Sequence, residues 1–265
     1  MVDGLRLDVA EGVATLTLDR PDALNALTFE IYRALPGVLA GLGEDRSVRV
    51  VVVTGAGKGF CSGGSVHEII RPLLGRPVRE VYDFARRTCD VIEAMRALRR
   101  PIIAAVNGVA VGAGAMLALA ADLRIASAKA RFGFLFTRVG LSGADMGACH
   151  LLPRVVGLGN ATELLLRGNL IGAEEAFRIG LVNRVVAPEA VQAETLALAL
   201  ELARGPAFAL GLTKEMLDRA FTMDLRAALE AEAQAQALCM SMPEFQEGHD
   251  AFVEKRDPDF RRFEP

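Results

Sequence analysis

The sequence predicts an α/β fold that is followed by a layer of helices at the C-terminal end. Short apolar runs at residues 50–53 and Ile102–Val106 each lead into a glycine-rich turn and then into a helical pattern. Apolar and polar residues alternate near the N-terminus, which is typical of half-buried strands. After residue 188 the helical periodicity continues and no strand pattern returns. Strands that alternate with helices indicate a sheet covered by helices.

The first hundred residues contain clear local signals. Residues 5–9 and 13–18 alternate apolar with polar side chains around a Glu-Gly pair, which predicts a β-hairpin. Thr28 is suited to cap a helix. The apolar face of that helix consists of Ile31, Leu35, Val38 and Leu39. Residues 49–53 predict a strand, and residues 78–98 predict a long helix that ends before a proline.

The centre of the chain continues the alternation of strands and helices. We expect a strand at Ile102–Val106, a buried helix that runs to Ala121, and another strand at residues 122–126. Residues 132–134 begin a segment that we predict to be irregular. A loop at residues 141–146, a helix at 147–156 and a strand at 181–186 are expected after it.

The last part of the chain is predicted to be nearly all helix. The helices are expected at residues 188–204, 206–220, 224–239 and 244–254. The change in composition near residue 190 divides the chain into a core of residues 1–190 and a helical region of residues 191–265. Alanine-rich stretches in the helical region would allow close packing against another subunit.

Composition excludes several classes of protein. Hydrophobic residues make up 52% of the chain and charged residues 24%, which indicates a globular protein. The net charge is −3 and no long basic run occurs, so we expect no nucleic-acid partner. Residues 102–121 carry no charge, but they contain Asn107 and three glycines. They therefore favour strand, turn and helix over a membrane span, and no membrane association is expected.

The cysteines indicate neither a metal site nor a disulfide framework. Their spacing matches no metal-binding motif, and the four residues are Cys61, Cys89, Cys149 and Cys239. The first residues lack the basic and apolar regions of a signal peptide. A reduced, cytoplasmic protein is therefore expected.

The two glycine-rich turns are the candidate functional feature. They occupy residues 55–64 and 107–114, and each precedes the start of a predicted helix. Glycine lets the backbone adopt unusual angles and come close to a ligand. The first N–H groups of a helix have no partner within it. Two such turns could direct two free N–H groups at one oxygen, which describes an oxyanion hole.

Six motifs in the expected order resemble the crotonase (enoyl-CoA hydratase/isomerase) superfamily over nearly the whole chain. They are DRPDALNAL at residues 19–27, FCSGG at 60–64, the segment 101–114, LPRVVG at 152–157, GLVN at 180–183 and AFVEKR at 251–256. The resemblance implies a spiral of ββα units with a C-terminal helical trimerisation region. It also implies a coenzyme A thioester substrate, no separate cofactor, and homotrimers that often pair into hexamers.

The resemblance assigns residues to the substrate site. The oxyanion donors would be the backbone N–H groups of Gly64 and Ala113. The backbone at Ala23, Leu24 and Ala26 would line the adenine site, and Lys255 would meet a phosphate unless it is simply a solvated lysine. The other positions assigned to substrate binding are Gly63, Ser65, Phe134, Phe136 and Phe252.

The sequence departs from the family at the catalytic carboxylates. A hydratase of this kind needs two glutamates to activate and add water. Counted from the second turn, these positions are Met116 and Phe136, and neither side chain can transfer a proton. Isomerisation or other enolate chemistry is therefore favoured over standard hydration. A hydratase with an unusual acid–base group and an acyl-CoA-binding relative without chemistry both stay open.

Asp145 is the first candidate for the acid–base group. Relatives that use an aspartate place it in the loop after residues 134–136, within one position of Asp145. Burial among glycine, alanine and methionine would raise its pKa. The alternative is that Asp145 caps the helix that begins near Gly147.

Residues after the first turn supply further candidates. His67 is a candidate because histidine is a common acid–base group, but it could simply pack or be solvated. Glu68 could act as a base or could stabilise the first turn of a helix. Ser65 could act only as a cap. Cys149 and His150 are adjacent on a predicted helix and do not face each other, which argues against a catalytic dyad.

Overall fold

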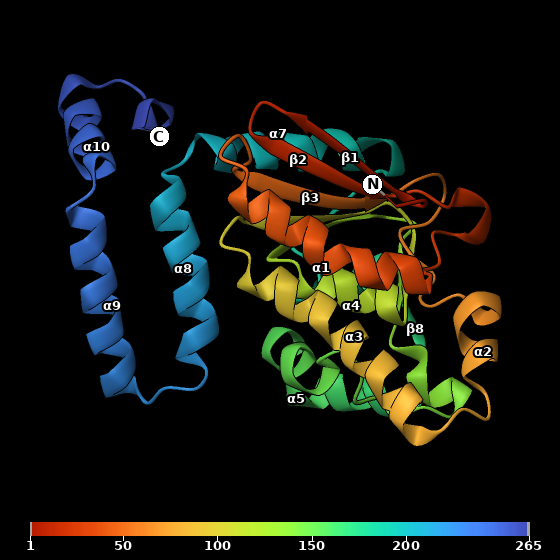
Figure 1. The fold of residues 1–265 in the computed structure, drawn as a ribbon. Helices are drawn as coiled ribbons and strands as arrows, with labels where there is room; N and C mark the ends of the chain where they lie inside the picture. Colours follow the sequence, from red (N-terminus) through yellow and green to blue (C-terminus); the bar gives the residue numbers. More distant parts are fainter. Residues whose placement is uncertain (1, 264–265) are drawn as a thin grey trace.

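The structure is a computed structural model, and it describes residues 2–263. Six strands form the central sheet in the order β1-β2-β3-β4-β6-β9 (Figure 1). Their bounds are Leu5–Ala10, Val13–Leu18, Val50–Gly55, Ile102–Val106, Leu123–Ser127 and Arg184–Val186. The hairpin of β1 and β2 is antiparallel, and the other neighbours in the sheet are parallel. Every residue of β3 and β4 is buried, which explains their unbroken apolar sequence.

A second sheet of three short strands gives the fold its repeating unit. The strands are β5 (Val109–Val111), β7 (Arg131–Gly133) and β8 (Leu170–Gly172). A bridge between Cys61 and Ala110 joins the first glycine-rich turn to β5. Successive units thus place one strand in each sheet and then a helix, so the expected ββα spiral is confirmed. The sequence did not predict these strands because three residues are too few to show a period of two.

Helices cover both faces of the central sheet (Figure 1). On one face lie α1 (Phe29–Glu44), α3 (Val78–Ala97) and α4 (Ala113–Ala120), whose apolar residues form the main core. On the other face α7 (Val191–Arg204) packs against β2, β3 and β4. The boundary predicted at residue 190 assigned α7 to the C-terminal region, whereas the structure places it against the sheet.

Two predicted elements differ from the structure in length. The helix expected at residues 147–156 is α5 (Ala148–Arg167), which continues past a break at Gly157, where φ is +78°. The strand expected at residues 181–186 begins only at Arg184, because the N–H groups of Leu181 and Val182 donate to the Ala176 carbonyl instead of to a neighbouring strand. Two helices were not expected, α2 (Arg71–Leu73) and α6 (Ala173–Arg178).

The last three helices form an arm beside the core. They are α8 (Ala207–Ala220), α9 (Leu225–Met240) and α10 (Pro243–Glu254). Figure 1 shows α8 and α9 standing side by side, with α10 at the end of the molecule opposite α2. No residue of α9 is buried. Among residues 2–263 no single helix is long and apolar enough to cross a bilayer. The segment Pro188–Arg204 and helix α8 reach that length and hydropathy only when they are taken together, and the two are bent by 107° relative to each other.

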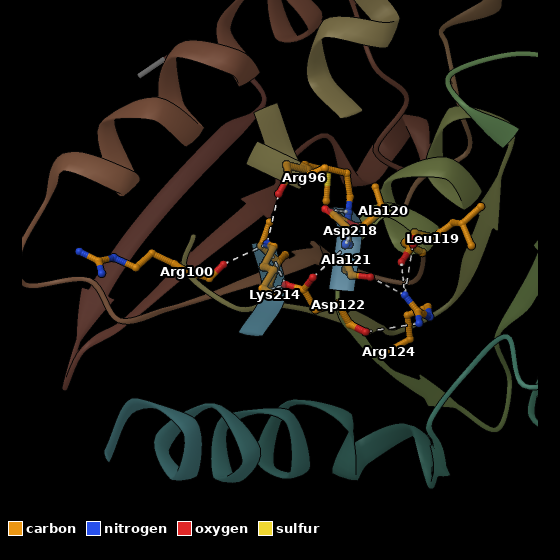
Figure 2. Close-up of polar contacts among 12 residues, drawn as sticks. Arg96, Arg100, Leu119, Ala120, Ala121, Asp122, Arg124, Lys214 and Asp218 are labelled. Carbon is orange, nitrogen blue, oxygen red and sulfur yellow. Dashed lines mark hydrogen bonds and ion pairs between the residues drawn. The ribbon is translucent and has the colours of Figure 1, made fainter. Parts of the chain in front are cut away.

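An ion-pair cluster fastens α8 to the core (Figure 2). The Lys214 ammonium lies 2.8 Å from the Asp122 carboxylate and donates to the Arg100 carbonyl at 3.1 Å. Arg96 of α3 binds Asp122 at 3.0 Å and also pairs with Asp218 of α8. The Asp122 carboxylate accepts the Ile102 N–H at 2.7 Å, so one side chain joins the arm to the start of β4.

A second buried cation lies at the C-terminal end of α4. Arg124 is 6% exposed, and its guanidinium donates to the carbonyls of Leu119 and Ala121 (Figure 2). Burial lowers the pKa of Arg124 to about 10, so it remains charged at neutral pH. A cation at the C-terminal carbonyls of a helix stabilises the helix dipole. The opposite end of that dipole is the N–H of Ala113.

Candidate active site

The first glycine-rich turn is held against residues 23–27 by backbone hydrogen bonds. The Leu27 N–H donates to the Gly63 carbonyl at 2.8 Å, and the Ser65 N–H donates to the Leu27 carbonyl at 2.9 Å. In a parallel bridge these two bonds flank Gly64, so the N–H of Gly64 itself points away from Leu27. Gly63 has φ +93°, a conformation that favours glycine.

The second turn presents the start of α4. Gly112 has φ +53°, and its N–H donates to the Gly133 carbonyl at 2.8 Å. Ala113 is the first residue of α4, so its N–H has no acceptor within the helix. In the part of the chain from residue 2 to residue 263, neither the Gly64 N–H nor the Ala113 N–H is hydrogen-bonded.

The two turns lie directly against each other. A Cβ atom built on Gly63 would be 3.6 Å from the Ala113 nitrogen. The Val111 N–H donates to the Cys61 carbonyl at 3.0 Å, which locks the turns in register. Two unpaired N–H groups on adjoining rigid turns can bind one developing oxyanion. The structure thus leaves both N–H groups unpaired on turns that contact each other, and the oxyanion hole of Gly64 and Ala113 stays a prediction.

The predicted adenine-site residues lie beside the first turn. Ser62 connects them to it, because its N–H donates to the Leu24 carbonyl at 3.0 Å and its hydroxyl to the Ala23 carbonyl at 3.2 Å. The Ala26 carbonyl accepts a hydrogen bond from Arg20 at 2.9 Å. The buried side chain of Asn25 donates to two carbonyls of residues 56–59 and fixes this segment.

Asp145 is half-buried in the loop between residues 135–139 and α5. Burial raises the pKa of its carboxyl above the ordinary value, and the Met146 N–H partly opposes the shift. The N-cap of α5 is Gly147, and no side chain caps the helix. The alternative that Asp145 caps α5 is therefore wrong, and its carboxylate stays available for proton transfer.

Glu68 has a different environment. Its carboxylate accepts hydrogen bonds from Arg20 at 2.7 Å and from the Ser65 hydroxyl at 2.9 Å, and these lower its pKa. The Ser65 hydroxyl in turn accepts the Glu68 N–H at 3.2 Å, a reciprocal capping arrangement for the short helix Val66–Ile70. This makes Glu68 a weaker proton acceptor than Asp145. His67 is exposed in the same helix, and among residues 2–263 its side chain has no hydrogen bond.

Met116 and Phe136, at which the resemblance places the two glutamate positions of the hydratases, are apolar and buried. Met116 is 0% exposed in the first turn of α4, and Phe136 is 6% exposed. Phe134 is 1% exposed and belongs to the same core cluster. No ionisable group from these positions can assist Asp145.

Two residues that were predicted to contact the substrate, Phe252 and Lys255, lie far from the two turns in this chain. Phe252 is 86% exposed on α10, and Lys255 is exposed directly after it. Since α10 lies at the end of the molecule opposite α2, which follows the first turn, one chain does not bring them to residues 23–26 (Figure 1). Lys255 has φ +55° and ends α10 in the left-handed conformation.

Sequence reasoning missed one side chain near the turns. Tyr32 was not singled out, because it falls on the apolar face of the predicted first helix and such positions are normally core. The signal that could have found it is chemical, since Tyr32 carries a hydroxyl, whereas Phe29, the other aromatic residue of that helix, does not. Within residues 2–263 no group of three or more His, Cys, Asp and Glu residues is placed to hold a metal ion.

Comparisons with known proteins agree with this fold. The family described as "Enoyl-CoA hydratase/isomerase" matches residues 8–262. The 1,2-epoxyphenylacetyl-CoA isomerase of Escherichia coli (strain K12) is 37% identical, covering 98% of this chain and 99% of the relative. The crotonyl-CoA hydratase of Syntrophomonas wolfei is 35% identical, covering 97% of this chain and 98% of the relative.

A solved structure is similar over nearly the whole length. It comes from Streptomyces coelicolor A3(2) and is provisionally called an enoyl-CoA hydratase. The identity is 51% and the TM-score 0.94, with 97% of this chain and 94% of that chain covered. The fold and the paired turns define an acyl-CoA enzyme of the crotonase type. The chain belongs to the enoyl-CoA hydratase/isomerase family.

Proposed function

We propose that the protein isomerises acyl-CoA thioesters by moving a proton next to the thioester carbonyl. The N–H groups of Gly64 and Ala113 stabilise the enolate oxygen. Asp145 takes the proton from one carbon and returns it to another. The acyl chain lies against the buried apolar side chains near Phe134 and Phe136.

The observation that carries this proposal is the contrast between the carboxylates of Asp145 and Glu68. Asp145 has a raised pKa and makes no capping bond, whereas Glu68 is paired with Arg20. One carboxylate can shuttle a proton between two carbons of a bound enolate. Addition of water needs a second group to orient and activate it, and the positions that supply it in hydratases are Met116 and Phe136.

The relatives support the substrate class more strongly than the reaction. One is named an isomerase and another a hydratase, and both names contain a CoA thioester. We therefore expect coenzyme A to act as part of the substrate, with no separate cofactor. The absence of the glutamate pair favours isomerisation over hydration.

Deuterium exchange tests the proposal. A 3-enoyl-CoA in D2O should become a 2-enoyl-CoA with deuterium incorporated, observed by NMR. Asp145→Asn should slow this reaction by about 100-fold or more, the usual contribution of a general base. Glu68→Gln is the matched control and should retain most of the activity. Rapid hydration of crotonyl-CoA that is unaffected by Asp145→Asn would contradict the proposal.

We also propose that the arm joins copies of the chain into a homotrimer, which could pair into a hexamer. Exposed apolar side chains line the arm, among them Leu225, Leu229, Phe245 and Phe252. An apolar groove of about 580 Å³ lies between α8 and α10. Contiguous exposed apolar surface is typical of sites that bind another protein, which supports the proposal. In such an assembly Phe252 and Lys255 would serve the site of a neighbouring copy.

The mass in solution tests this assembly. Light scattering after gel filtration should give a multiple of three times the 28.3 kDa chain. Leu229→Glu should reduce it to the monomer, because it places a charge in the apolar interface. Val9→Glu changes an exposed residue of β1 and should leave the mass unchanged. A monomeric wild-type protein would refute the assembly.

A further inference from the structure

Tyr32 is a buried phenol within α1, close to the candidate oxyanion hole. The chain contains two tyrosines, of which Tyr32 is 4% and Tyr82 64% exposed. The Tyr32 ring packs edge-on against Phe84 of α3, with ring centroids 5.7 Å apart and an interplanar angle of 89°. Phe84 also contacts Phe29 at 5.2 Å, so the aromatic cluster holds the phenol in one position.

The hydroxyl of Tyr32 is directed at the first turn. A Cβ atom built on Gly64 would lie 3.9 Å from the Tyr32 hydroxyl oxygen and 3.8 Å from the Ile69 side chain. Gly64 carries one of the two free N–H groups of the hole. The phenol therefore reaches the region in which the thioester end of the acyl group would bind.

The hydroxyl has no partner in the protein. A buried tyrosine hydroxyl usually finds a hydrogen-bond partner. From residue 2 to residue 263, no backbone or side-chain group is hydrogen-bonded to the Tyr32 hydroxyl. It is also not one of the fully occluded polar atoms that lack a partner. It therefore faces space that water or a ligand can reach.

The charge state of Tyr32 makes it a donor. Burial raises the pKa of Tyr32 well above the usual value, and nearby Cys61 and Asp145 raise it further. The phenol thus keeps its proton at neutral pH and can donate it in a hydrogen bond.

The neighbours that the structure gives for Tyr32 are mainly apolar. Its ring packs on Phe84, and its hydroxyl and the Ile69 side chain both lie within 4 Å of the point where a Cβ atom on Gly64 would be. A single donor in an apolar site discriminates between ligands, because a ligand without an acceptor leaves the donor unpaired once water is displaced. A ligand that places an oxygen atom next to the Tyr32 hydroxyl accepts the hydrogen bond that the displaced water had accepted.

We propose that the Tyr32 hydroxyl determines specificity by donating a hydrogen bond to an oxygen atom on the acyl group, at the first or second carbon beyond the thioester carbonyl. The preferred substrates are then oxygenated acyl-CoA thioesters, such as hydroxyacyl, oxoacyl or epoxyacyl esters, rather than plain hydrocarbon chains. This inference rests on the proposed acyl-CoA site and adds the class of acyl group.

Calorimetric binding of matched esters tests the role of Tyr32 without requiring turnover. The probes are butyryl-CoA, 2-hydroxybutyryl-CoA and 3-hydroxybutyryl-CoA, each with the wild-type protein and with Tyr32→Phe. The wild type should bind one of the hydroxy esters at least about fivefold more tightly than butyryl-CoA, the effect of one neutral hydrogen bond. Tyr32→Phe should lose this preference and still bind butyryl-CoA as the wild type does.

Tyr82→Phe is the matched control, because it removes the same atom from the exposed tyrosine, and it should keep the preference. Equal binding of all three esters by the wild type, or a preference that persists in Tyr32→Phe, would overturn the proposed role of Tyr32. Neither result would contradict the proposed acyl-CoA site. Failure of every ester to bind would overturn the proposed acyl-CoA site together with this inference.

Discussion

A Cβ atom at Gly114 would lie 2.1 Å from the carbonyl oxygen of Cys61. No side chain fits at this distance, so the second residue of α4 packs backbone to backbone against the first turn. This contact holds the start of α4, which carries the Ala113 N–H, against the turn that contains Gly64. The proposed oxyanion hole therefore depends on a glycine that does not itself supply a donor.

We expect Gly114→Ala to separate the two turns and to lower kcat by about 100-fold or more, since each oxyanion donor contributes about that factor. The melting temperature should also fall. Gly41→Ala is the matched control, because a Cβ there meets nothing within 4 Å on helix α1. That variant should keep its activity and gain stability slightly. Normal turnover in Gly114→Ala would contradict the proposal that the oxyanion hole depends on this glycine.

Ala113→Pro tests the second donor directly. Proline is tolerated at the first position of a helix, so α4 should still form while the N–H is removed. We expect kcat to fall by about 100- to 1,000-fold with a smaller change in KM. Ala113→Gly keeps the N–H and should retain most of the activity. Steady-state kinetics on the preferred acyl-CoA ester would reveal whether the N–H of Ala113 matters.

The turns and long elements could be predicted from the sequence because their signals are local. The strand at Ile102–Val106 has the predicted bounds, and the Thr28 cap accepts the Ile31 N–H at 3.3 Å. Gly63 and Gly112 indicated the turns, because the chain there adopts positive φ angles that favour glycine. The hydrogen bonds and contacts that join the two turns could not be derived from the sequence, because the turns lie fifty residues apart.

Other features were hidden because they depend on tertiary packing. Residues 191–204 have a helical pattern that does not reveal which surface they cover, and in the structure they pack on the sheet. Tyr32 has the spacing of a core residue, and only the structure shows that its hydroxyl reaches Gly64. Asp145 could be named from the sequence, but its burial had to be observed.

The anchor of the arm can be tested at Asp122. Asp122→Asn removes the charge that pairs with the buried Lys214, so an uncompensated ammonium remains. We expect a loss of about 3–5 kcal/mol of unfolding free energy. Glu215 lies on the same helix as Lys214 and forms an exposed ion pair with Arg99. Glu215→Gln breaks this pair and should lower the unfolding free energy by less than about 1 kcal/mol. Urea unfolding of both variants would show whether burial makes this difference.

The raised pKa of Asp145 predicts the acidic limb of the activity profile. A base must be deprotonated, so kcat/KM should fall as pH drops through the pKa of Asp145. Because burial raises that pKa, the limb should lie above the usual value of about 3.9 for aspartate. Glu68→Gln should leave the limb in place. If kcat/KM instead falls only at or below the ordinary pKa of aspartate, the base is another group.

The same shift predicts that Asp145 destabilises the folded protein. A carboxyl whose pKa is higher in the folded state binds its proton more tightly there, so folding is penalised at pH values above both pKa values. At pH 7 the Asp145→Asn variant should therefore unfold at a higher urea concentration than the wild type. The difference should shrink as pH falls through the raised pKa and vanish below the ordinary one. Asp145→Asn that is less stable than the wild type at pH 7 would show that the carboxylate is held by a favourable partner instead.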